Sequence, residues 1–198
     1  MNIIFDLGNV LIEWNKEKIL SKICKNDLEY NLFNKLVFQS NLWIDLDNGK
    51  ISLEFLENQL IDEMGHHQDQ IHELVWNWFN YVDLYDEVYE LIKQLKKKNF
   101  QIYVLSNTSS IFHILLDSVL SKVSSVLDGY VISCEVKMMK PQKEIYLSLV
   151  NKYQLDIKDC IFLDDLEENV EAARTLGIKA FQIKERKEIS NILKDLLN

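Results

Sequence analysis

Four short apolar runs in this chain of 198 residues lead to polar residues that a packed core would not select. Asp6 follows the first run, Ser106 ends the second, Lys140 comes after the third, and Asp165 follows the fourth. Carboxylates can hold Mg²⁺ through the hard oxygen ligands that this cation requires. A lysine and a serine can bind the phosphate oxygens that the metal leaves uncovered. Together, these residue types predict a site for phosphoryl transfer.

The four side chains can meet only if the apolar runs are neighbouring strands. The predicted strands are residues 3–5, 102–105, 130–132, 161–163 and 180–183. Helical patterns at 84–95, 111–123 and 187–197 separate or follow the later strands. This alternation is typical of an α/β fold with a doubly wound, Rossmann-like parallel sheet. Such sheets bind ligands at the carboxyl ends of their strands, where the four polar residues stand.

Residues 15–82 break the alternation, because they are rich in helix formers and aromatic residues and have no strand pattern. We expect a helical cap over the strand ends, with residues 1–14 and 83–198 forming the α/β core. Asn48-Gly49 predicts a turn between two cap helices. Ser52 is the expected N-cap of the next helix.

Two aromatic residues are candidates for contact with a ligand. Trp43 lies in the predicted cap beside Asp45 and Asp47, and Trp14 directly follows the first polar motif. Either could face the substrate. The alternative is that Trp43 belongs to the hydrophobic core of the cap and that Trp14 contacts the cap.

Composition limits the classes of partner. With 22 Lys and Arg against 31 Asp and Glu, the formal net charge is -9, which disfavours nucleic acid because its binding depends on clustered cations. No segment has the roughly 18 apolar residues of a membrane span, and no basic n-region precedes the first apolar run. We therefore expect a cytoplasmic protein that acts on a small molecule and not at a membrane. The sequence does not indicate an oligomeric state.

The polar motifs resemble those of the haloacid dehalogenase-like hydrolases, which carry them in this order. The matching segments are Phe5-Asp6-Leu7-Gly8-Asn9-Val10, Leu105-Ser106-Asn107-Thr108, Lys140-Pro141, and Asp164-Asp165 with Asn169. The resemblance implies a phosphatase of subfamily IA with a helical C1 cap. Within the superfamily, these motifs and Gly49-Lys50-Ile51-Ser52 look most like the bacterial alpha-D-glucose-1-phosphate phosphatase branch.

The resemblance implies catalytic roles for four residues. Asp6 would attack phosphorus and become an aspartyl phosphate. Ser106 and Asn107 would bind the transferring phosphoryl group. Lys140 would orient Asp6, bind the phosphate and neutralise the charge that develops on its oxygens.

The resemblance also implies a magnesium site. Asp165, a carboxylate oxygen of Asp6 and the backbone carbonyl of Gly8 would bind Mg²⁺ directly. Asp164 and Asn169 would support these ligands.

One position departs from the common pattern of the superfamily. Most of its phosphatases have a second Asp two residues after the nucleophile, which protonates the leaving oxygen, whereas this chain has Gly8. General acid catalysis of this kind contributes about 10² to 10⁴ in rate. From the sequence alone we expect a strong preference for good leaving groups, such as an anomeric sugar phosphate over the matching 6-phosphate.

The favoured function is Mg²⁺-dependent hydrolysis of a small phosphorylated metabolite, with a sugar phosphate such as glucose 1-phosphate as the leading substrate. One alternative is a 2-haloacid dehalogenase, whose Asp attacks carbon, but those enzymes need no metal and typically lack the acidic pair. A second alternative is a catalytically quiet protein that binds a ligand or partner. Gly8 is the only support for it.

Overall fold

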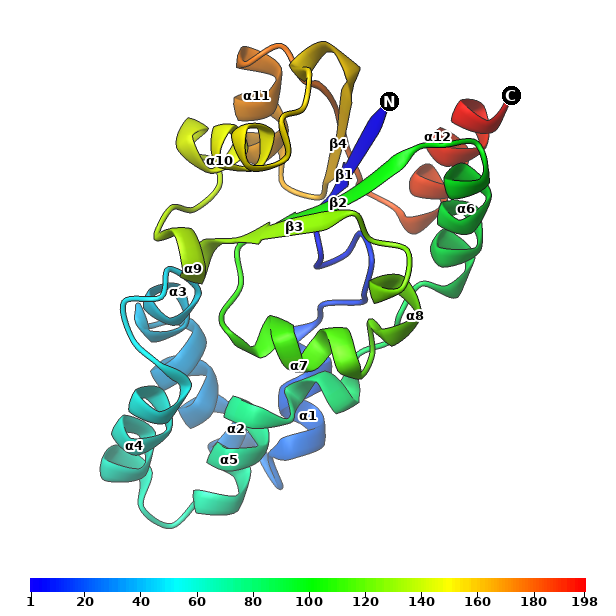
Figure 1. Ribbon diagram of the computed structural model, residues 1–198. Coiled ribbons are helices and arrows are strands. Elements are labelled where there is room, and N and C mark those ends of the chain that lie inside the picture. Colours follow the sequence, from blue (N-terminus) through cyan, green and yellow to red (C-terminus); the bar gives the residue numbers. More distant parts are fainter.

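The computed structural model describes all 198 residues and contains one five-stranded sheet in which every pair of neighbouring strands is parallel (Figure 1). The strands are β1 (Asn2–Phe5), β2 (Gln101–Ser106), β3 (Gly129–Ile132), β4 (Cys160–Asp164) and β5 (Lys179–Gln182). Their spatial order is β3-β2-β1-β4-β5, so β1 is central. The predicted α/β fold class and the positions of all five predicted strands are confirmed.

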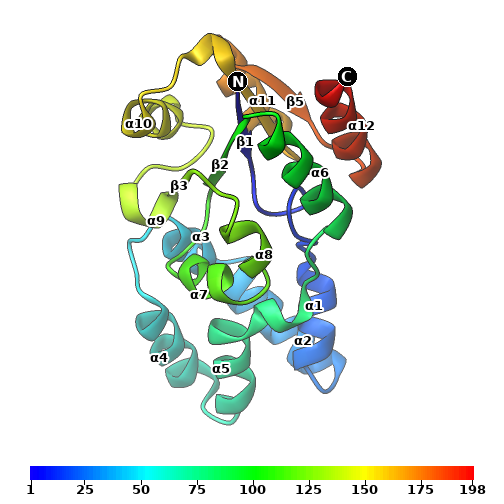
Figure 2. The ribbon, with the colours of Figure 1, turned by 45° about the vertical axis from the view of Figure 1, so that its right-hand side comes forward.

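Alternate residues of the strands enter two different hydrophobic cores. Ile3 and Phe5 face one core, whereas Ile4 faces the other, as the pleat of a strand requires. The flanking helices are α6 (Asp86–Lys97), α10 (Lys143–Tyr153), α11 (Glu167–Thr175) and α12 (Arg186–Leu197), with the short η3 (Ile157–Asp159) before β4. Figure 2 shows α6 and α12 on one face of the sheet and α10 on the other. Both faces are therefore covered.

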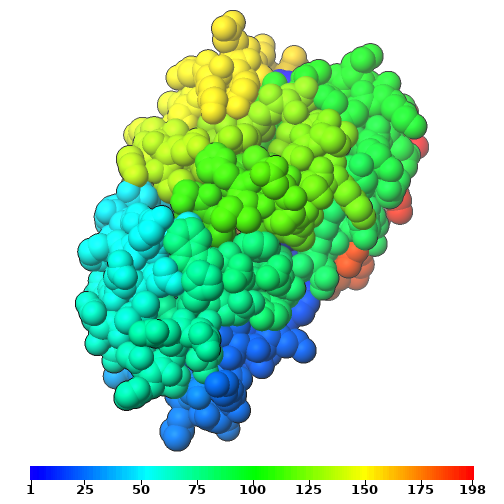
Figure 3. Space-filling view, turned by 60° about the horizontal axis from the view of Figure 1, so that its bottom comes forward, coloured from blue at the N-terminus to red at the C-terminus, as the bar shows by residue number.

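Between β1 and α6 the chain is helical. This segment contains α1 (Lys16–Ile23), α2 (Asp27–Phe33), η1 (Asn34–Phe38), α3 (Leu42–Asp47), α4 (Leu53–Met64), α5 (Gln68–Trp76) and η2 (Trp78–Tyr81). It leaves and rejoins the sheet region at neighbouring points, because Ile12 and Leu84 form an antiparallel bridge. Its buried side chains belong to the same cluster of 38 residues as one face of the sheet, and Figure 3 shows the segment packed closely against the rest of the chain. None of the helices combines the length and apolarity needed to cross a bilayer.

Local details of the helical segment confirm two expectations, the turn at Asn48-Gly49 between α3 and α4 and the N-cap of α4. The hydroxyl of Ser52 accepts a hydrogen bond of 3.1 Å from the backbone N–H of Phe55 and so caps α4. Gly49 has φ +65°, the left-handed conformation that a turn often requires of glycine.

The helical pattern at 111–123 does not form one helix. The chain forms α7 (Ile111–Asp117) and α8 (Ser121–Ser124) instead, followed after β3 by the short α9 (Ser133–Val136). Helix α7 ends because the N–H groups of Ser118 and Leu120 both bond back to the Leu115 carbonyl. That arrangement closes the last turn and stops propagation of the helix.

Candidate active site

Asp6 stands directly after the central strand of the sheet. Its backbone N–H donates to the Leu163 carbonyl of β4 at 2.8 Å, so the ladder between β1 and β4 fixes the position of the residue. Ser106 is the last residue of β2, and Asp164 is the last residue of β4. Because β2 and β4 both flank β1, these side chains leave the sheet at the same edge.

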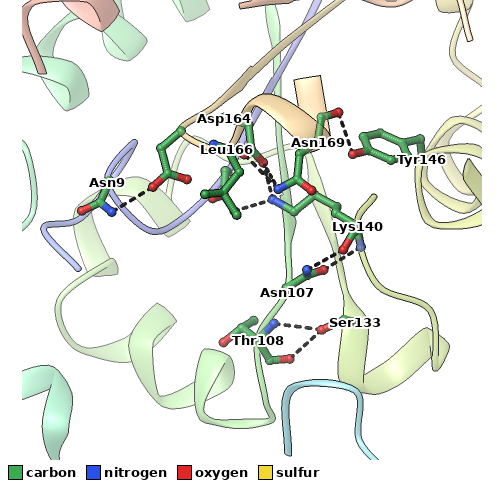
Figure 4. Close-up of polar contacts among 11 residues, drawn as sticks. Asn9, Asn107, Thr108, Ser133, Lys140, Tyr146, Asp164, Leu166 and Asn169 are labelled. Atoms are coloured by element: carbon green, nitrogen blue, oxygen red, sulfur yellow. Dashed lines mark hydrogen bonds and ion pairs between the residues drawn. The ribbon is translucent and has the colours of Figure 1, made fainter. Parts of the chain in front are cut away.

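A buried lysine joins two of the carboxylates. The Nζ atom of Lys140 lies 2.7 Å from Asp6 Oδ1 and 2.6 Å from Asp164 Oδ2. Desolvating charges is costly, so such a group is stable only when each member is well paired. Asp164, which is fully buried, also accepts bonds from Asn169 Nδ2 and from the Leu166 backbone N–H (Figure 4). Both of its oxygens are thus occupied by donors of the protein itself.

Asn107 holds the backbone of Lys140 in place. Its Nδ2 donates to the Lys140 carbonyl at 2.9 Å, and its Oδ1 accepts from the Lys140 N–H at 2.8 Å (Figure 4). The side-chain amide is therefore engaged, which leaves the backbone of Asn107 to face a ligand. Ser106 lines the cavity at the end of β2, although only 3% of the residue is exposed.

Burial dominates the electrostatics of Asp6. It raises the pKa of this carboxyl to about 7, Lys140 opposes the rise, and the nearby Asp164 adds to it. Burial alone would lower the pKa of Lys140, but Asp6 and Asp164 outweigh it and raise that pKa above its ordinary value. Lys140 is therefore a permanent cation beside a carboxyl group that changes charge near neutral pH.

Asp165 lies on the outer side of this network. It is partly exposed, and its Oδ2 accepts a bond of 2.9 Å from Asn9 Nδ2 (Figure 4). Burial raises the pKa of Asp165, and the bond from Asn9 opposes the rise. Ligand atoms of Asp6, Asp164 and Asp165 lie within 4.8 Å of one another. Since the oxygens of Asp164 are already satisfied, Asp6 and Asp165 have the free oxygens.

Gly8 contributes backbone only. Its carbonyl accepts no hydrogen bond in the structure. A Cβ atom built on Gly8 would lie 3.2 Å from Cβ of Trp14, closer than nearly all real contacts of this kind. A side chain at position 8 would therefore begin in tight contact with Trp14.

These groups line one cavity of about 370 Å³. Of the residues singled out from the sequence, the lining includes Asp6, Gly8, Trp14, Trp43, Ser106, Asn107, Lys140, Asp165 and Asn169, but not Asp164. Trp14 and Trp43 stack with ring centroids 5.7 Å apart, and Trp78 meets Trp14 edge-on at 4.8 Å. With Phe38, these rings form an aromatic wall opposite the strand ends.

Residues 1–177 match the family model of the haloacid dehalogenase-like hydrolases. The chain belongs to this family.

Characterised members of the family resemble the chain at low identity. A flavin mononucleotide hydrolase of Arabidopsis thaliana is 28% identical over 156 residues, which are 78% of this chain and 62% of that protein. A D-ribitol-5-phosphate phosphatase of Bacteroides thetaiotaomicron is 25% identical over 189 residues, 91% of this chain and 90% of that protein. The chain thus spans less than two thirds of the first relative and nearly all of the second.

A solved structure of the family shows the same architecture. A haloacid dehalogenase-like enzyme of B. thetaiotaomicron, in complex with magnesium and inorganic phosphate, superposes with a TM-score of 0.77 at 26% identity. The match covers 91% of this chain and 92% of that one.

Three polar residues of the site in the present chain were not predicted from the sequence. Asn9 positions Asp165, Ser133 bonds to the loop after β2, and Asp47 lines the cavity from the end of α3. A signal existed for Ser133, which follows β3 directly as the other site residues follow their strands. Asp47 stands two residues before the predicted turn glycine, but a helical pattern does not tell which way its carboxyl points.

Proposed function

We propose that this hydrolase is a phosphomonoesterase that removes phosphate from a small phosphorylated metabolite, with a sugar phosphate such as glucose 1-phosphate as the leading substrate. The observation that carries the proposal is the pairing of Asp6 with the buried Lys140 at the end of a cavity. A carboxylate oriented by a fixed cation is suited to attack phosphorus. The similarity to a D-ribitol-5-phosphate phosphatase and to a flavin mononucleotide hydrolase supports the proposal.

In the proposed mechanism, the carboxylate of Asp6 attacks phosphorus and forms an aspartyl phosphate, which water then hydrolyses. Lys140 keeps one oxygen of Asp6 in place and neutralises charge on the phosphoryl oxygens. The hydroxyl of Ser106 and the backbone of Asn107, both in the cavity lining, bind those oxygens. Asn107 also keeps Lys140 in position through its amide.

The donors left free in the site suit Mg²⁺. This cation prefers oxygen ligands and binds through one or two carboxylates. Asp6, Asp165 and the carbonyl of Gly8 would hold it, because each offers an oxygen that no group of the protein occupies. Asp164 supports the site by accepting hydrogen bonds from Lys140 and from Asn169, which in turn holds Asp164 in place. Mg²⁺ would supply positive charge that stabilises the phosphoryl group during transfer.

The helical segment has the place of a specificity cap in this proposal. We assign residues 15–82 to the cap and residues 1–14 and 83–198 to the core. The cap contributes most of the aromatic wall of the cavity, including Trp43 and Trp78. Its shape would decide which leaving group fits beside Asp6.

The test is release of phosphate from p-nitrophenyl phosphate and then from a panel of phosphorylated metabolites. We expect turnover that requires Mg²⁺ and that Asp6→Asn abolishes, because the amide keeps the shape of the side chain but is not a nucleophile. Turnover that persists undiminished in saturating EDTA or in the Asp6→Asn variant would refute the mechanism. Release of halide from 2-haloacids without metal would identify a dehalogenase instead.

A further inference from the structure

The end of helix α3 is fastened to the core beside the cavity. The buried hydroxyl of Ser133 donates to the Asp47 carbonyl and accepts a bond of 2.9 Å from the Thr108 backbone N–H. The Lys137 ammonium donates to the Gly49 carbonyl. One serine therefore joins the helical segment to the loop that follows β2. Figure 4 shows the contacts of Ser133 with Thr108 in that loop.

The contact leaves no room for a side chain on Gly49. A Cβ atom built there would lie 2.3 Å from the carbonyl oxygen of Cys134, a distance that real atoms do not reach. The backbone of this segment therefore lies directly on α9. As a result, Asp47 has a fixed position relative to the core.

The carboxyl group of Asp47 lines the same cavity as Asp6. It forms no ion pair, and the backbone N–H of Ser109 is the donor that faces it. Burial raises the pKa of Asp47 well above the usual carboxyl range, while the bond from Ser109 opposes the rise. Asp45, two residues earlier on the same helix, does have a charged partner, because its Oδ1 lies 2.7 Å from Lys50 Nζ at the surface.

The other ionisable groups of the cavity already have roles in the proposed reaction. Asp6 is the nucleophile, Lys140 is paired with it, and Asp165 is assigned to the metal. Position 8, where many relatives have an acid, is glycine, and Trp14 occupies the adjoining space. Asp47 is the remaining carboxyl group in the lining.

We propose that Asp47, supplied by the helical segment, is the acid that protonates the leaving oxygen, an inference that rests on the proposed phosphatase function. In the first step, an oxygen of Asp6 bonds to phosphorus as the bond from phosphorus to the leaving oxygen breaks. The proton of the Asp47 carboxyl moves to that oxygen. The products are an alcohol, the aspartyl phosphate and the Asp47 carboxylate.

The second step returns the proton. Water attacks phosphorus while the Asp47 carboxylate accepts one of its protons, and the bond between phosphorus and Asp6 breaks. Inorganic phosphate leaves, Asp6 is a carboxylate again, and Asp47 is protonated. Charge and atoms balance over both steps without a further reactant.

The inference changes the leaving-group dependence expected from Gly8 alone. An enzyme without an acid depends steeply on the leaving-group pKa, whereas a positioned acid makes that dependence shallow because the alcohol leaves neutral. We expect a shallow slope of log kcat/KM against leaving-group pKa in the unmodified protein, measured over aryl and alkyl phosphates. A steep slope would overturn the proposal, and this measurement does not depend on the folding of any variant.

The decisive variant is Asp47→Asn, with Asp45→Asn as the matched control from the same helix. For Asp47→Asn we expect kcat/KM to fall about 10² to 10⁴-fold with alkyl phosphates. With p-nitrophenyl phosphate, whose leaving group needs no proton, we expect a fall of less than about tenfold. Asp45→Asn should leave both values unchanged.

An equal loss with both kinds of substrate would show that Asp47 is structural, and an undiminished rate with alkyl phosphates would exclude it as the acid. Either result overturns the inference but not the proposed function. Absence of p-nitrophenyl phosphate turnover in the unmodified protein would instead refute the function itself, and the inference with it.

Discussion

The two walls of the cavity are built from different interactions. The wall formed by the strand ends contains Asp6 and Lys140, and Asp164 pairs with Lys140 outside the lining; the charged atoms of all three lie within 2.7 Å of a partner. The wall formed mainly by the helical segment consists of stacked aromatic rings and the unpaired carboxyl of Asp47. A substitution that removes one charged side chain from the first wall leaves a buried charge without its partner. A substitution of an aromatic residue in the second wall removes only apolar contacts. The charged network of Asp6 and Lys140 and the aromatic surface of the helical segment thus lie on different walls, and Asp47 is the one carboxyl group that the helical segment adds to the cavity.

Lys140→Met should have the largest effect, because it leaves two buried carboxylates without their cation. We expect loss of phosphatase activity and a decrease of about 3 to 5 kcal/mol in the free energy of unfolding. The exposed Lys158 has no ion pair, so Lys158→Met is the control and should change stability by less than about 0.5 kcal/mol. Denaturant unfolding and phosphate release measure the two quantities. A Lys140→Met variant as stable and active as the control would show that the paired wall is not needed.

Asp165→Asn and Asp164→Asn test which of these two adjacent carboxylates binds the metal. Asp165 has a free oxygen, whereas every oxygen of Asp164 accepts a bond from the protein. We expect Asp165→Asn to raise the Mg²⁺ concentration for half-maximal activity by about 100-fold, and Asp164→Asn to raise it far less. The measurement is activity against Mg²⁺ concentration for both variants. Equal effects or the reverse order would mean that the metal ligand is misassigned.

The raised pKa of Asp6 makes Mg²⁺ binding dependent on pH. Without metal, the folded protein binds this proton more tightly than the unfolded chain does, because the pKa rises from 3.8 to about 7. The stability that the proton contributes is present at acid pH and is lost as the pH rises through about 7. Mg²⁺ requires the carboxylate, so we expect its affinity to fall about tenfold per pH unit below about 7.

Calorimetric titration with Mg²⁺ between acid and alkaline pH would measure this dependence. The Asp6→Asn variant lacks both this titrating group and one proposed metal ligand, so it should bind Mg²⁺ more weakly and without this dependence on pH. An affinity that stays constant in the unmodified protein across this range would place the pKa of Asp6 elsewhere.

Changes in the aromatic wall should have the smallest effects. Trp43 lines the cavity, whereas Trp76 belongs to the same segment but bonds to Glu57 away from the cavity. We expect Trp43→Ala to lower kcat/KM for a good substrate about tenfold through loss of apolar contact, with inhibition by inorganic phosphate unchanged. Trp76→Ala should leave kcat/KM unaltered. If Trp43→Ala weakened inhibition by phosphate equally, the separation between the two walls would be wrong.

The strands and the residues that follow them could be predicted because the pleat and the strand direction restrict where a residue points. Asp6 and Ser106 are examples, since each stands at the end of a strand whose apolar pattern is clear. Asn107 illustrates the limit of such reasoning. Its position in the loop was predicted, but the engagement of its amide with Lys140 depends on a residue 33 positions away.

The contacts of the helical segment could not be predicted for a different reason. Helical periodicity gives a buried face but not the element that covers it. Phe55 and Leu56 are adjacent apolar residues in the first turn of α4, yet 51% of Phe55 is exposed while Leu56 is fully buried. The unpaired carboxyl of Asp47 likewise results from the way in which α3 meets α9, which no local pattern encodes.

Gly49 has a consequence for how proteins with this architecture can diverge. Any larger residue there would push the backbone away from Cys134 and carry Asp47 out of position. Trp43 is under less restriction, since it is only partly buried and a different ring there alters mainly the space offered to a leaving group. Over evolutionary time, substrate preference can therefore drift at position 43 while position 49 stays glycine. In descendants of this chain that acquire new substrates, we expect Gly49 to stay unchanged although it does not line the cavity.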